Sequence, residues 1–290
     1  MSHSDRLTRT PDTFRRLTGL SPAAFDQLLA QLTPRYHEAE ARPGRRRQPG
    51  AGRKHALPLA DRLLMLLLYY RTYVSHAFLG FLFGLDDSSV GRNINPLQPL
   101  LAGLFRIPER RVELQPDEIR ELFFDATERP TRRPVRRQRR CYSGKKRRHT
   151  LKNQLVVARK RKRPGRRRPG QRQKRRLRNA AVSPTSPGKV HDKKVYDRSR
   201  VLLPPGVAAY GDTGYRGTAL RTPAKKRPGQ PLTARQRRGN RRLSRQRVAV
   251  EHGIGKLKIW RIAAERYRNP VRRHTLILKN VAGLHNRMYA

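Results

Sequence analysis

The chain has 290 residues, and 69 lysines and arginines against 20 aspartates and glutamates give it a formal net charge of +49. Its length allows two domains, and 36% hydrophobic residues can still form a core once the basic segments are set aside. One cysteine excludes a disulfide framework and a cysteine-rich zinc site. The longest apolar run, Leu63–Tyr70, is far shorter than the roughly 20 residues that span a bilayer.

This charge predicts a polyanionic partner. A chain so basic repels itself unless its charge is neutralised, and nucleic acid does this favourably because phosphate contacts release counterions. We therefore expect a cytoplasmic, nucleoid-associated protein that binds nucleic acid and no membrane. The composition says nothing about chemistry.

The first 112 residues predict a helical region. Ser21 suits an N-cap and Pro22 the first helical position, and apolar residues then recur at helical spacing. A basic break at Arg42–Lys54 precedes a second helix, Leu57–Thr72, which is apolar on most faces and is expected to be buried.

Residues 75–105 have the pattern of a helix-turn-helix. A short apolar helix ends at Gly84, a brief turn follows, and Ser88 can cap a second helix that runs to about Phe105. A plain helical hairpin would show the same pattern, so the DNA-binding interpretation depends on the charge. We predict residues 1–112 as a helical DNA-binding region.

From about Glu113 the periodicity becomes that of strands, which predicts a mixed α/β domain over residues 113–290. A helix is expected at roughly Asp192–Leu202 and a long one from about Thr233 to Arg268. Four buried strands are expected: Glu121–Thr127, Leu151–Val157, Ala180–Val182 and Val207–Tyr210.

Two basic segments interrupt this domain. Thr131–His149 holds ten lysines or arginines, and Arg159–Arg178 holds thirteen in twenty residues. The second is expected as a loop between two strands. Its charge of one sign favours an arm that follows DNA over a solvated hairpin loop with no task of its own.

Carboxylates are rare in this half of the chain, and Asp192, Asp197 and Asp212 are the only ones between residues 128 and 251. Asp125 ends an apolar strand, where a carboxylate is costly unless a cation or hydrogen bonds stabilise it. Asp212 ends another strand, beside glycines that permit close approach of the backbone. Asp192 opens a helical run, where an aspartate is commonly a cap or first-turn residue, yet it rivals Asp212 as a functional acid.

Glu251 lies on the long predicted helix. Arg247, Glu251 and Lys258 fall within about 40° of one another on one face, although an arginine and a glutamate there can also form an ordinary salt bridge. Two strand-end aspartates and a helical glutamate together provide oxygen ligands for two Mg²⁺ ions of the kind that catalyse phosphodiester displacement.

Four segments occur in a specific order: Phe124–Pro130, Tyr142–Gln154, Ser186–Lys194 and Gly211–Tyr215. They resemble the DDE transposases of bacterial insertion sequences, in the group related to the eukaryotic Harbinger superfamily. The resemblance covers Phe124 to about Arg268. It implies an RNase H-like α/β catalytic domain preceded by an all-α region with a helix-turn-helix.

The resemblance also implies the site. Asp125, Asp212 and Glu251 match the family's catalytic acids, which bind two Mg²⁺ or Mn²⁺ ions. Related transposases carry a Tyr-x₂-Arg-x₃-Glu-x₆-Lys signature around the glutamate, and here Ser244 stands at the tyrosine position. Ala126 replaces the usual glycine after the first aspartate. The cations expected to bind DNA are Arg247, Lys258, Lys145, Lys146, Arg147, Arg148, Arg166, Arg167 and Arg168.

The predicted function is that of a transposase that binds the terminal inverted repeats of its insertion sequence, cleaves them and joins the freed 3′-hydroxyl to target DNA. A homo-oligomer on DNA is expected. One alternative is a non-catalytic DNA-binding protein descended from such an enzyme, and another is a basic RNA-binding structural protein. Neither accounts for three spaced carboxylates in a region that is otherwise almost free of acid.

Overall fold

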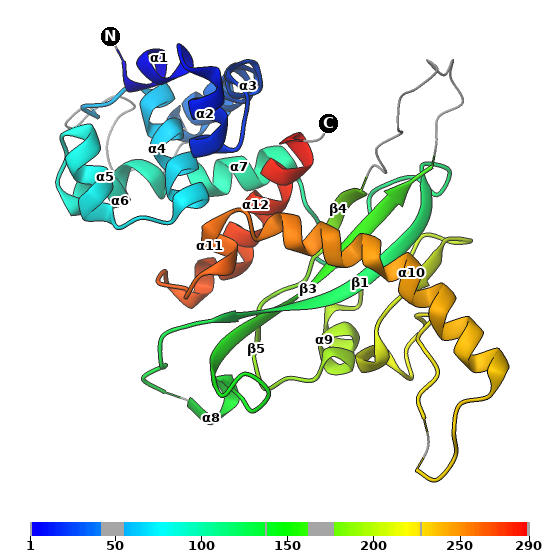
Figure 1. The fold of residues 1–290 in the computed structure, drawn as a ribbon. Coiled ribbons are helices and arrows are strands. Elements are labelled where there is room, and N and C mark those ends of the chain that lie inside the picture. The colour runs from blue at the N-terminus through cyan, green and yellow to red at the C-terminus, as the bar shows by residue number, and fades with distance from the viewer. Residues whose placement is uncertain (1, 42–54, 137, 162–176, 227, 289–290) are drawn as a thin grey trace. The chain divides into compact units, whose positions relative to one another are not determined.

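The chain passes back and forth between two structural units in the computed structural model (Figure 1). The structure describes residues 2–41, 55–136, 138–161, 177–226 and 228–288. The helical unit holds Met1–Arg106, Lys258–Glu265 and Leu276–Ala290, and the sheet unit holds Ile107–Leu257 and Arg266–Thr275. The predicted domain over residues 113–290 differs from this division, because Lys258–Glu265 and Leu276–Ala290 belong to the helical unit. Local periodicity carries no record of such distant contacts.

The helical unit is built around α4, where ten residues are buried. α3 begins as predicted, with Pro22 in its first turn and Ser21 Oγ accepting the amide of Ala24 at 3.3 Å. No described helix is both long and apolar enough to cross a membrane. The helices of this unit are α1 (His3–Thr8), α2 (Pro11–Thr18), α3 (Pro22–Ala41), α4 (Leu59–Thr72), α5 (His76–Phe83), α6 (Asp87–Ile94), α7 (Leu97–Phe105), α11 (Arg261–Ala264) and most of α12 (His274–Met288).

The helix-turn-helix segment differs from the prediction in two details. α5 does end at Gly84, which takes a left-handed conformation (φ 65°), but α6 is capped by Asp86 and not by Ser88. The Asp86 carboxylate accepts the amide of Ser89 at 2.9 Å. The predicted single helix to Phe105 is interrupted, because Pro96 cannot donate a helical hydrogen bond and a new helix, α7, begins after it.

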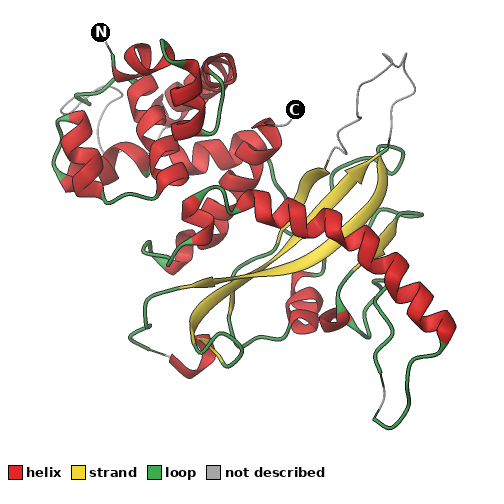
Figure 2. Ribbon diagram, in the orientation of Figure 1, coloured by secondary structure: helices red, strands yellow, loops and turns green. Residues whose placement is uncertain are grey.

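The sheet unit contains a mixed six-stranded sheet (Figure 2). β1 pairs antiparallel with β3 and parallel with β6, while β2, β4 and β5 each pair antiparallel with β3. The central strands are longer than predicted. The strands are β1 (Ile119–Pro130), β2 (Tyr142–Ser143), β3 (Arg148–Lys160), β4 (Leu177–Val182), β5 (Ser186–Pro187) and β6 (Ala208–Tyr210).

Side chains alternate along β1, so neighbouring residues point to opposite faces of the sheet. Phe124 packs edge-on against Tyr196 of α9, and α10 contacts β1, β3 and β4.

α10 ends at Leu257 and not near Arg268, so the predicted helix is too long. The helices of this unit are α8 (Gln138–Cys141), α9 (Asp192–Ser199), η1 (Thr213–Tyr215), α10 (Ala234–Leu257) and η2 (Val271–Arg273).

The predicted basic loop Arg159–Arg178 is partly strand. Arg159 and Lys160 belong to β3, and Leu177 and Arg178 belong to β4. Residues 162–176 lie outside the described residues, as does the predicted basic break at 42–54.

Candidate active site

The parallel pairing of β1 and β6 brings two aspartates to the same edge of the sheet. Phe123 pairs with Tyr210, and Asp125 and Asp212 each follow two residues later. Asp125 is half-buried on β1, while Asp212 caps η1 and accepts the amide of Gly214 at 2.9 Å. Paired residues of parallel strands lie side by side. Asp125 and Asp212, each two residues after the pair Phe123 and Tyr210, are therefore brought together although they are far apart in the sequence.

The electrostatics of Asp125 confirm that it shares its surroundings with other charges. Burial raises the pKa of its carboxyl to about 6, and the negative charge of Asp212 adds to this effect. The amide of Ala126, which donates to Asp125 at 2.8 Å, and the cation of Arg247 act in the opposite direction. Asp192 contributes a further negative charge. Three aspartates and one arginine therefore act on one another here.

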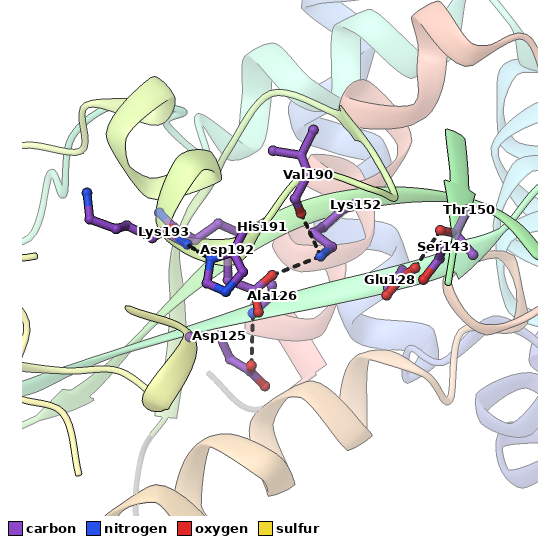
Figure 3. Close-up of polar contacts among 12 residues, drawn as sticks. Asp125, Ala126, Glu128, Ser143, Thr150, Lys152, Val190, His191, Asp192 and Lys193 are labelled. Carbon is purple, nitrogen blue, oxygen red and sulfur yellow. Dashed lines mark hydrogen bonds and ion pairs between the residues drawn. The ribbon is translucent and has the colours of Figure 1, made fainter. Parts of the chain in front are cut away.

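Asp192 stands in the first turn of α9 and is tied to β3 (Figure 3). Lys152 Nζ donates to Asp192 Oδ1 at 2.9 Å and to the carbonyl oxygen of Val190 at 2.8 Å. A Cβ at Gly214 would stand 3.0 Å from both Asp192 Oδ2 and Asp212 Oδ1, so the two carboxylates flank that glycine. The helix-terminal role of Asp192 is as expected, and its place within the acidic cluster is additional.

Glu251 is not gathered with these aspartates. Its side chain is exposed on α10, and the described residues contain no group of three His, Cys, Asp or Glu side chains arranged to hold a metal ion. Arg247, one helical turn earlier, is the side chain of α10 that acts on Asp125. The role of Glu251 as a third ligand stays a prediction.

The other predicted site residues are dispersed. The cations at 145–148 are exposed: the first three lie in the turn between β2 and β3, where Arg147 takes a left-handed conformation (φ 48°), and Arg148 is the first residue of β3. Lys258 lies beyond the end of α10 and belongs to the helical unit, so it does not continue the stripe of Arg247. Ser244 is exposed on α10, and Arg166, Arg167 and Arg168 fall outside the described residues.

Lys152 and Gly214 lie beside the candidate site and are absent from the predicted site residues. Lys152 is 9% exposed within a strand whose neighbours are buried, and a lysine inside a buried run was the available signal. Gly214 lies in the Gly211–Tyr215 motif, whose glycines are expected to permit close approach of the backbone. Its lack of a side chain is what admits Asp192 beside Asp212.

The cluster suits a divalent cation. Burial is the main cause of the raised pKa of Asp125, and the charge of Asp212 adds to it; a cation bound between two such carboxylates relieves the repulsion between them. Carboxylate oxygens are also the hard ligands that Mg²⁺ and Mn²⁺ prefer.

Comparison with known proteins identifies the family. The family model of the DDE superfamily endonuclease matches residues 174–286, and the model of the helix-turn-helix of DDE superfamily endonuclease matches residues 55–107. A curated relative from Microchaete diplosiphon, named a probable transposase for insertion sequence element IS702, is 30% identical over 285 residues, which are 96% of this chain and 94% of the relative. A second, from Streptomyces albus G, carries the name of a transposase for insertion sequence element IS112 and is 27% identical over 279 residues, 95% of this chain and 94% of the relative.

No solved structure matches the chain. The chain belongs to the insertion-sequence transposases of the DDE superfamily, as its motifs predicted. The helix-turn-helix prediction is confirmed over residues 55–107.

Proposed function

We propose that this chain cleaves DNA at the ends of its insertion sequence and transfers the freed 3′ ends to target DNA, with Asp125 and Asp212 at the reacting phosphate. The observation that carries this proposal is the parallel register of β1 and β6, in which Asp125 and Asp212 each follow two residues after the pair Phe123 and Tyr210. Burial raises the pKa of Asp125, and the charge of Asp212 adds to this effect. Perturbed carboxyl groups of this kind are typical of functional sites.

The sheet supports an RNase H-like catalytic domain. Three antiparallel strands, β1, β3 and β4, are extended by a parallel β6, and helices pack against the sheet. In this arrangement the first acid lies on a central strand and the second follows the adjacent parallel strand. We infer the RNase H-like fold from that topology.

Asp125 and Asp212 would hold the divalent ions, with Glu251 supplied by α10 as the third acid. The bound ions would activate a water or 3′-hydroxyl and stabilise the leaving oxygen. Asp125 must lose its proton to serve as a ligand, and Arg247 assists this by lowering its pKa. Arg247 is also placed to contact the negatively charged phosphate beside these acids.

DNA binding would involve both units. In the helical unit, α5 and α6 form the helix-turn-helix that we expect to bind the terminal inverted repeats. In the sheet unit, the exposed cations at 145–148 would contact backbone phosphates, which position DNA without selecting sequence. We expect the protein to act as a homo-oligomer on DNA.

A Mg²⁺-dependent nicking assay on the DNA that flanks its coding region tests the proposal. The parent should nick this DNA, while Asp125→Asn, Asp212→Asn and Glu251→Gln should each bind it and not nick it. Removing negative charge beside bound phosphates should leave affinity equal or slightly higher. A folded parent that binds this DNA and never nicks it, with Mg²⁺ or with Mn²⁺, would favour the non-catalytic alternative.

A further inference from the structure

Arg159 begins the most basic segment of the sequence, yet its side chain is buried. It is 12% exposed and forms an ion pair with Glu121, whose side chain is 9% exposed. Its guanidinium also lies 4.9 Å from the centroid of the Phe123 ring. Both partners are on β1, so a residue expected to face DNA is instead fixed against the sheet.

The guanidinium of Arg159 also contacts α10. Arg159 Nη2 donates to the carbonyl oxygen of Gln246 in the middle of α10, at 3.2 Å. The next residue of that helix, Arg247, acts on Asp125. A planar guanidinium can bind a carboxylate and a carbonyl at once in a fixed geometry, which makes this contact directional.

α10 has a second attachment nearer its beginning. The Asn240 side chain both accepts the amide of Ala224 and donates to its carbonyl oxygen, each at 2.9 Å. Most residues of this helix are polar. The contact at Gln246 lies next to Arg247, which acts on Asp125.

We propose that Arg159 is a positioning residue, which Glu121 orients so that it holds α10 at Gln246 and thereby places Arg247 beside Asp125. The inference rests on the proposed function for its effect on cleavage. Its structural part, the attachment of α10, can be measured without any cleavage.

The main test variant replaces the buried pair with an apolar pair, Glu121→Leu together with Arg159→Met. Replacing both members of a buried ion pair by apolar side chains is often neutral for stability, so this variant is expected to fold. The matched control is Arg161→Met. Arg161 lies one residue beyond β3 and donates through Nε to the carbonyl oxygen of Ile119 at 3.0 Å, which ties it to β1 and not to α10.

Two measurements are made on parent, test variant and control. Amide hydrogen exchange in the last third of α10 should rise about tenfold or more in the test variant and stay within twofold in the control. Single-turnover cleavage at saturating DNA should fall about tenfold or more in the test variant, because small displacements of catalytic groups are costly, while DNA affinity stays within threefold. Arg159→Lys should retain part of the rate, since lysine keeps the charge but lacks the planar guanidinium that binds a carboxylate and a carbonyl at once.

The outcomes separate the two hypotheses. Unchanged exchange in α10 of the folded double variant overturns the inference, whatever the cleavage result. Equal loss of rate in the test and control variants overturns it too, since that identifies general damage to the sheet. If exchange rises as expected while even the parent fails to nick DNA, the attachment is supported and the proposed function fails.

Discussion

Lys152 Nζ and Asp192 Oδ1 lie 2.9 Å apart in a largely buried ion pair that joins β3 to the first turn of α9. The other carboxylate oxygen of Asp192 faces Gly214, next to Asp212. Asp192 therefore has one oxygen that accepts from Lys152 and one directed at the loop that carries Asp212. Asp192 thus lies next to Asp212 across Gly214, and its negative charge is paired with Lys152.

This arrangement predicts coupled effects of Lys152→Met and Asp192→Asn. Each should slow cleavage about tenfold, and the double variant should be no slower than the worse single variant, because both changes break the same contact. Asp212→Asn should abolish cleavage. If Asp192→Asn in a folded protein abolishes cleavage while Asp212→Asn spares it, the second ligand is Asp192.

Gly214→Ala should slow cleavage by a steric effect. The added Cβ would lie 3.0 Å from one oxygen each of Asp192 and Asp212, which is tighter than ordinary contact. We expect a reduction in cleavage of about tenfold or more with little change in DNA affinity. Gly144→Ala is the control, since no atom lies within 4 Å of a Cβ at that position. Equal rates in the two variants would mean that the loop adjusts freely.

Asp125 should make the stability of the protein depend on pH. Its pKa is about 6 in the folded state against an ordinary 3.8, so the folded state binds the proton more tightly than the unfolded state. The free energy of unfolding should therefore fall as pH rises from about 4 to about 6, by at most roughly 3 kcal/mol and by less because the group is partly exposed.

Asp125→Asn removes this dependence. The variant should be more stable than the parent at about pH 7.5, and the difference should shrink towards about pH 4, as measured by denaturant unfolding. Mg²⁺ should raise the unfolding temperature of the parent at the higher pH and leave that of the variant almost unchanged. Asp197→Asn, which alters an exposed acid paired with Lys193, is the control. Parallel pH curves for parent and Asp125→Asn would contradict the prediction.

Arg247 and Lys258 should differ in their effect on rate. Arg247 acts on Asp125, so Arg247→Ala should slow single-turnover cleavage at saturating DNA at least about tenfold, roughly 1.4 kcal/mol of barrier. Lys258 lies outside α10, and Lys258→Ala should have a smaller effect. An ordinary surface pair of Arg247 with Glu251 would contribute only about 0.3–0.5 kcal/mol, so a change within twofold for Arg247→Ala would identify it as such.

DNA binding should weaken steeply with salt. The net charge of +49 implies many phosphate contacts, and six or more would cost on the order of a thousandfold in affinity between roughly 50 and 200 mM salt. Equilibrium titrations at several salt concentrations measure this slope. An affinity that hardly changes with salt would show that the positive charge does not contact DNA phosphates.

Sequence periodicity predicted the elements whose packing is regular. The apolar α4 and the central strands β1 and β3 were expected because their buried residues repeat along the chain. Asp125 is a candidate because a carboxylate in an apolar run is costly, and Asp212 because it ends a strand beside glycines. The proximity of the two aspartates depends on the parallel pairing of β1 with β6, which no local sequence pattern predicts.

Other features depended on contacts that are distant in sequence. The end of α10 at Leu257 precedes Trp260, a fully buried residue whose ring lies against Gly19 in the helical unit. Helical spacing continued past that point, so the predicted helix was too long. Arg159 was grouped with its basic neighbours because composition cannot reveal a buried partner on another strand.

The helical unit is completed by the latest part of the chain. Asn280 of α12 donates to Tyr70 Oη at 3.1 Å and to the carbonyl oxygen of Gln98 at 2.9 Å, and Gly283 allows the ring of Phe105 to pack directly on the helix backbone. During synthesis, α1 to α7 therefore leave the ribosome long before their last packing partner does. A nascent chain would hold an incomplete helical unit until α12 has emerged, and by then Asp125, Asp212 and Glu251 have also been made.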